Sequence, residues 1–178
     1  MHTLATDVIT QAALAAGLPE GRVYDVARKD NITQKRPRVE IQFLPEKHTR
    51  TGRMLGITRT QTEQVRKKEL YAVELTVLAN VFAESEQWLS GFCYAFMAAL
   101  PRGRNDSRGN WVRIRSAKAQ FVHTPPPRVG EKSIEPMKRF NQIFSLTFTG
   151  RVTSEDREAL IETFTIEPRI GGKHGQEG

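Results

Sequence analysis

Side chains that commonly catalyse reactions or hold metals are few and scattered in this sequence. Catalysis requires a nucleophile, a base or a set of ligands that converge on one point. The chain has four histidines, and none has another histidine four residues away or a cysteine beside it. These are His2, His48, His123 and His174. They fall in predicted termini and loops, so we expect solvated histidines and no metal site.

The single cysteine, Cys93, lies between Phe92 and Phe96 in an apolar pattern with helical spacing. We expect it to be buried and unreactive, because a nucleophilic cysteine needs an electropositive and partly exposed setting. One cysteine also excludes an intramolecular disulfide and a multi-cysteine zinc or iron–sulfur site. Glu84 and Glu86 sit at the start of a predicted helix and suit its dipole. We therefore expect no enzymatic activity, no metal and no cofactor.

The charge of the chain is the first positive indication of function. Lys and Arg number 27 and Asp and Glu number 20, which gives a formal net charge of +7 on 178 residues. A nucleic acid, an acidic protein partner and plain solubility each explain such an excess. Which of these three explanations applies depends on where the basic residues lie in the sequence.

Two polar stretches, residues 47–68 and 102–108, are rich in basic residues and contain no Phe, Tyr or Trp. The aromatic residues instead follow core spacing. Modules that stack bases interleave aromatic and basic side chains, so base recognition is disfavoured, while attraction to a phosphate backbone stays open. Asp106 is expected to neutralise an arginine of its own loop. The candidate residues for contacts with other subunits or partners are Arg50, Arg53, Arg59, Arg66, Lys67, Arg102, Arg104, Arg108 and Arg128.

The first part of the chain predicts a helix and then a strand. Residues 4–16 carry small apolar side chains at helical spacing, with Thr3 as a suitable N-cap and Gly17 as a stop. Residues 38–44 alternate apolar and polar side chains between two prolines, which favours a strand with defined ends.

The middle of the chain predicts a polar excursion followed by the main core elements. Residues 46–68 are too polar for a core and too long for a simple connection, so they form a functional segment or a projecting hairpin. Residues 69–82 are largely apolar on both faces, which predicts a central strand covered on each side. Ser85 then caps a helix that runs to Leu100 and stops at Pro101.

The last third predicts two more strands with a stiff connection between them. Three consecutive prolines enforce an extended backbone, so residues 123–139 form a Pro-rich arm. The remaining predictions are strands at 111–122 and 143–152, a short capped turn at 154–160, an extended piece at 163–167 and a disordered tail at 171–178.

Length and composition predict one domain over residues 1–170, including the excursion and the Pro-rich arm. No apolar run approaches the roughly 20 residues of a membrane span. The first residues lack the pattern of a secretory signal. We therefore expect a soluble protein made in the cytosol, without a membrane partner.

Several local patterns resemble those of bacteriophage tail terminator proteins and the related tail-completion and neck proteins. An Ala-rich N-terminal helix leads into Leu-Pro-Glu-Gly-Arg-Val-Tyr at 18–24 and a Pro-flanked strand at 36–41. A long strand containing 71–77, a helix at 87–100 and a strand containing Val-Arg-Ile at 112–114 follow. The resemblance covers most of residues 4–152 and rests on the order of elements, not on a catalytic motif.

This resemblance implies an α+β fold, with a mixed, mostly antiparallel β-sheet and two main helices packed on one side, plus extended loops or arms. It implies a virion protein of the tail or neck, assembled in the host cytoplasm as a homo-oligomeric, hexameric ring. The implied partners are the tail tube protein and a neck or head-completion protein. The longer excursion at 47–68 and the Pro-rich segment at 125–136 depart from compact members of the family, and they would suit an extra contact with a sheath protein. Genomic DNA would pass through the lumen without specific recognition, and the family implies no catalytic residue.

Two other functions stay open at the level of sequence. A head-completion or stopper protein of the neck would bind the portal side and not the tube. A basic nucleic-acid-binding module would show salt-dependent DNA affinity that falls when Arg102, Arg104 and Arg108 are replaced.

Overall fold

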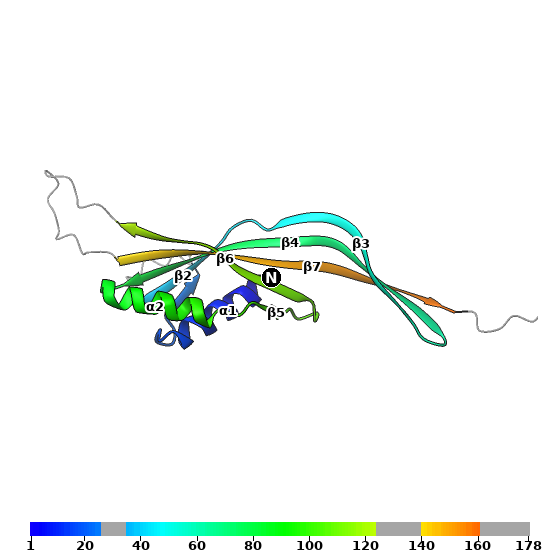
Figure 1. Ribbon diagram of the computed structural model, residues 1–178, viewed down its shortest axis with the longest axis horizontal. Helices are drawn as coiled ribbons and strands as arrows, with labels where there is room; N and C mark the ends of the chain where they lie inside the picture. Colours follow the sequence, from blue (N-terminus) through cyan, green and yellow to red (C-terminus); the bar gives the residue numbers. More distant parts are fainter. Residues whose placement is uncertain (26–34, 124–139, 161–178) are drawn as a thin grey trace, which may run out of the picture.

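The computed structural model describes residues 1–25, 35–123 and 140–160. Within them the chain forms two helices and seven strands, an α+β fold as predicted (Figure 1). In chain order the elements are α1 (His2–Ala15), β1 (Val23–Asp25), β2 (Arg38–Phe43), β3 (Lys47–Arg59), β4 (Glu63–Ala83), α2 (Glu86–Ala99), β5 (Gly103–Asn105), β6 (Trp111–His123) and β7 (Phe140–Ala159).

The strands form one mixed sheet in the order β1-β2-β4-β7-β6-β5, with β3 also paired to β4. Strands β1 and β2 are parallel, and every other pair is antiparallel. Both helices lie on the same side of this sheet (Figure 1). The predicted mostly antiparallel sheet with two helices on one side is therefore confirmed.

Strand β4 pairs with three other strands, β7, β3 and β2. One of its edges pairs with β7 from Glu63 to Ala83. Its other edge pairs first with β3, opposite residues 64–74, and then with β2, opposite residues 77–82. The first part of β4 thus lies in a three-stranded ribbon that extends beyond the helices (Figure 1). We call β3, residues 63–72 of β4 and residues 151–159 of β7 the arm.

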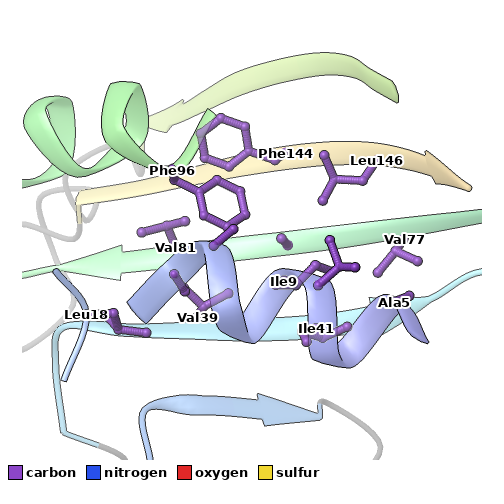
Figure 2. Close-up of a cluster of buried hydrophobic side chains, with 14 of the residues drawn as sticks. Ala5, Ile9, Leu18, Val39, Ile41, Val77, Val81, Phe96, Phe144 and Leu146 are labelled. Atoms are coloured by element: carbon purple, nitrogen blue, oxygen red, sulfur yellow. The ribbon is translucent and has the colours of Figure 1, made fainter. Parts of the chain in front are cut away.

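The core lies between the helices and the sheet. Alternate residues of β2, β4 and β7 point toward the helices and meet small residues of α1 and aromatic residues of α2 (Figure 2). The rings of Phe96 on α2 and Phe144 on β7 have centroids 5.3 Å apart. Fully buried side chains include Ala5, Ile9, Val39, Ile41, Leu75, Val77, Val81, Phe96, Phe144, Leu146 and Phe148.

The helix ends agree with the sequence in three of four cases, including the end of α2, whose C-cap is Leu100. The Ser85 hydroxyl accepts a hydrogen bond from the Trp88 backbone N–H at 3.3 Å, so the predicted cap of α2 is confirmed. Gly17 ends the C-terminal turn of α1 with a φ of +94°, which glycine adopts without strain. The predicted cap at Thr3 is wrong, because α1 already begins at His2 and Met1 occupies the N-cap position without a side-chain bond.

The central strand was predicted to be covered on each side, and this is wrong for the face away from the helices. The apolar residues Leu78 and Phe82 on that face are half-buried without a helix above them. Phe82 is covered instead by Arg38, whose guanidinium carbon lies 4.3 Å from the ring centroid. Neighbouring side chains within the sheet therefore shield this face.

Two segments form longer strands than their sequence predicts. The excursion at 46–68 is a projecting hairpin, one of the two forms expected, built from β3 and the start of β4. The turn predicted at 154–160 is wrong, because β7 continues through Ala159. Acidic residues on this part of β7 form ion pairs with basic residues of β4. The strand therefore continues here without the alternating apolar residues by which a strand is predicted from sequence.

Some predictions lie outside the described residues. These are the Pro-rich arm beyond residue 123, the extended piece at 163–167, the tail at 171–178 and the candidate residue Arg128. The single domain over residues 1–170 stays a prediction.

Candidate functional site

Residues with potential for acid–base or metal chemistry do not assemble in the described part of the chain. No group of three His, Cys, Asp or Glu side chains there could hold a metal ion. His2 and His48 both contact Glu46, with their Nε2 atoms 3.6 Å and 3.1 Å from its carboxylate oxygens. This trio, in which the histidines are exposed and Glu46 is half-buried, joins the start of α1 to the start of β3. The sequence did not indicate it.

Cys93 is buried in the core, as predicted. Burial raises the pKa of its thiol from 9.0 to about 12, because the thiolate would lose its hydration. The thiol is therefore protonated at neutral pH, and the rarity of its thiolate makes it a poor nucleophile.

The basic residues on the β4 side of the arm are paired with acids on β7. Arg66 Nη2 lies 3.2 Å from Glu158, Lys67 Nζ 3.5 Å from Glu155, and Lys68 Nζ 3.1 Å from Asp156. Two of the predicted interface residues, Arg66 and Lys67, are thus neutralised within the chain. In the arm, charge pairing thus helps to hold β4 and β7 together.

The predicted interface residues on β3 have a different environment. Arg59 donates from Nε to Gln64 Oε1 at 3.0 Å, across the hairpin. Arg50 and Arg53 are exposed, and neither forms an ion pair with another described residue. A bulge separates them, and Gly52 within it has a φ of +59°. These two arginines project from the outer strand of the arm.

The arm also exposes apolar side chains far from the core. Met54 is 45% exposed and Ile57 is 51% exposed. Met54 pairs with Lys68 and Ile57 with Arg66, and these two partners are two residues apart on β4. Met54 and Ile57 therefore share one face of the ribbon, and we call them the apolar row of the arm. Leu70 and Tyr71, also exposed, lie at the bulge where the arm joins the helix-covered part. Exposed apolar groups in such a row mark a contact surface.

The second predicted basic stretch is the loop and strand that follow α2. Arg102, Arg104 and Arg108 are exposed, and Arg104 donates from Nη1 to Gln11 Oε1 on α1 at 3.0 Å. Asp106 was expected to neutralise an arginine, and this is wrong. Its carboxylate accepts hydrogen bonds from the backbone N–H groups of Arg108 and Asn110, at 2.9 Å and 2.8 Å.

The structure adds a row of residues that sequence reasoning did not single out. Trp111, Arg113, Arg115 and Lys118 lie on β6, on the face of the sheet away from the helices, and we call them the β6 row. All four are exposed, and Trp111 is exposed over 51% of its surface. Within the described residues, none of the three basic ones forms an ion pair.

Each basic residue of the β6 row faces a hydroxyl residue on β7. Arg113 pairs with Thr149, Arg115 with Thr147 and Lys118 with Ser145, the last after a bulge at residues 116–118. The pattern that could have revealed the row is alternation, because Val112 and Ile114 are buried on the opposite face. The expectation that aromatic residues follow core spacing is wrong for Trp111 and also for Tyr94, which is 79% exposed on α2.

Comparisons with other proteins add no further residues to these surfaces. Neither helix of the described chain has the length and apolar character needed to cross a membrane. No protein-family model matches the chain, and no curated protein sequence matches it either.

Proposed function

We propose that this chain is a structural protein of a bacteriophage virion that caps the end of the tail tube as a ring. In this role it stops tail polymerisation and joins the tail to the head–neck complex. The resemblance in the order of elements supports this function. The observation that carries it is the arm, a three-stranded ribbon that extends beyond the helix-covered sheet.

A domain of this size does not need the arm for its own core. Strand β3 is exposed along nearly its whole length, and only Leu55 is half-buried. Ordering each residue of such a ribbon costs about 1–2 kcal/mol of conformational entropy, which burial of apolar surface normally offsets. The arm buries little within its own chain, so we infer that a neighbouring subunit or a tail protein covers it.

The edges of the arm also favour assembly. Within the described residues, the outer edge of β3 and the edge of β7 beyond Thr149 pair with no other strand. Open edges offer unpaired backbone groups to another chain. A contact between the arm of one subunit and a different surface of the next is heterologous, and such contacts close into rings when the rotation allows it.

The proposal is tested on tail tubes assembled from the tube protein of the virus that encodes this chain. Negative-stain microscopy should show tubes of limited length with a ring at one end when the chain is present, and tubes that keep growing without it. A chain that binds the portal side and leaves tube growth unchanged would instead be a head-completion or stopper protein.

A matched pair of variants makes this test specific for the arm. Met54→Ser/Ile57→Ser removes the apolar row of the arm, whereas Met97→Ser removes a methionine of similar exposure, 40%, from α2. We expect the first variant to lose tube capping and the second to retain it. Equal capping by both variants would contradict the role given to the arm.

A further inference from the structure

A second concentration of positive charge without acidic partners lies outside the arm. From residue 102 to residue 118 the chain has six Arg or Lys residues and one Asp, a net charge of +5 out of the +7 of the whole chain. The single acid, Asp106, bonds to backbone N–H groups. In the arm, by contrast, three basic residues are paired with acids. Residues 102–118 therefore form a basic segment whose Arg and Lys side chains have no acidic partner within the described residues.

We propose that the β6 row and the β7 hydroxyl residues beside it bind a single strand of nucleic acid. The basic side chains and the hydroxyl groups would contact the phosphates, and Trp111 would stack on a base. This site is separate from the proposed ring function, because it lies on the sheet face away from the helices and does not include the apolar row of the arm.

The arrangement of the cations suits a phosphate backbone. Arg113 and Arg115 are two residues apart on one face of a strand, a spacing of about 6.7 Å, and Lys118 continues the row after the bulge. Arg, Lys, Ser and Thr side chains are the usual ligands of phosphate oxygens in nucleic-acid complexes. The nearest acid by strand pairing is Glu74, which lies beyond Thr149 on β4. Three cations with adjacent hydroxyls thus form a continuous track.

Trp111 distinguishes this track from a surface for an acidic protein. One side of the indole lies on Gly103, where a Cβ would come within 2.6 Å of Trp111 Cε2. The ring packs closely against this glycine, and Trp111 remains 51% exposed. An exposed aromatic ring beside a basic track is a feature of proteins that bind single strands without sequence preference.

The first test measures binding of the full chain to a fluorescent oligothymidylate by anisotropy over a range of salt concentrations. Arg113→Gln/Arg115→Gln/Lys118→Gln should weaken binding at least tenfold and reduce the salt slope by about 2, because three phosphate contacts are lost. The matched control is Arg66→Gln/Lys67→Gln/Lys68→Gln, which removes the same charge from the arm and should change the affinity less than threefold. Equal losses in both variants would overturn the site, because only net charge would then matter.

The second test separates base stacking from simple attraction. Trp111→Leu keeps an apolar side chain on Gly103 but should lose about 5- to 150-fold in affinity, while Trp111→Phe should retain most of it. In a Trp88→Phe background, binding should quench the fluorescence of Trp111. Binding of poly-glutamate as tight as that of the oligonucleotide would identify an acidic protein surface and overturn the proposal. Duplex DNA bound as tightly as the single strand, with no effect of Trp111→Leu, would also overturn it.

Discussion

The indole ring of Trp111 on β6 lies on the α-carbon of Gly103 on the neighbouring strand β5. A Cβ at position 103 would approach Trp111 Cε2 and the Val112 carbonyl oxygen to within 2.6 Å. The absence of a side chain at position 103 thus leaves room for the indole beside the edge strand, while Trp111 remains 51% exposed. This contact joins the first residue of the β6 row to the short strand β5, which also pairs with β6.

Gly103→Ala should destabilise the protein by about 1–3 kcal/mol, the usual cost of overpacking. One of the two obstacles is the backbone oxygen of Val112, so movement of the Trp111 ring alone does not relieve the clash. Unfolding in urea measures the change. Gly91→Ala on α2 is the control, because a Cβ there meets nothing within 4 Å and alanine favours a helix by about 0.5–1 kcal/mol. An unchanged stability of Gly103→Ala would contradict the contact.

Phe96→Ala should lower the free energy of unfolding by about 3–5 kcal/mol. Phe96 is fully buried, and it joins α2 to β7 through Phe144, so its removal leaves a cavity between the helices and the sheet. Tyr94→Ala, two residues away on the exposed side of the same helix, should change stability by less than about 0.5 kcal/mol. Similar losses in the two variants would show that α2 packs on a different face.

The ion pair between Lys68 and Asp156 should contribute about 0.2–1 kcal/mol in a double-mutant cycle of Lys68→Gln and Asp156→Asn. The Lys68 side chain is 38% exposed and that of Asp156 is 52% exposed, so solvent reaches the pair and the coupling energy should fall as the salt concentration rises. Unfolding at low and high salt gives the two values. A coupling energy of zero at low salt would mean that the paired charges do not help to hold the arm together.

Cys93 should react with a thiol reagent only when the protein unfolds, because burial raises the pKa of the thiol to about 12. Between about pH 9 and pH 12 the native thiol keeps a proton that the unfolded chain releases. Unfolding is therefore favoured as the pH rises, and the stability of the wild type relative to Cys93→Ala should decrease over this range. Modification of the native protein at the rate of the unfolded chain would refute the burial.

Much of the fold could be predicted because its signals are local. Ser85 precedes an apolar pattern with helical spacing, and two prolines bracket β2, so these elements begin and end where the sequence indicates. The end of β7 was mistaken for a turn because Glu155, Asp156 and Glu158 offer no apolar alternation. Their partners lie on β4, about 90 residues earlier in the sequence, and only the strand pairing brings them together.

The candidate site was less predictable than the fold for the same reason. Arg66 and Lys67 were expected to face a partner, but their charges are balanced across the sheet by β7. Arg113 and Arg115 alternate with the buried Val112 and Ile114, so the sequence pattern places the two arginines on one face of β6. The pattern does not show which residues of β7 lie beside them, and only the strand pairing brings Thr149 and Thr147 next to the two arginines.

Native mass spectrometry of the full chain, with and without Met54→Ser/Ile57→Ser, tests the proposed ring most directly. The unmodified chain should form one closed oligomer, and negative-stain images of it should show a ring with a central opening. The variant should be a folded monomer, since both substituted side chains are exposed within the single chain. An unmodified chain that stays monomeric, alone and with tail tube protein, would contradict the proposed ring.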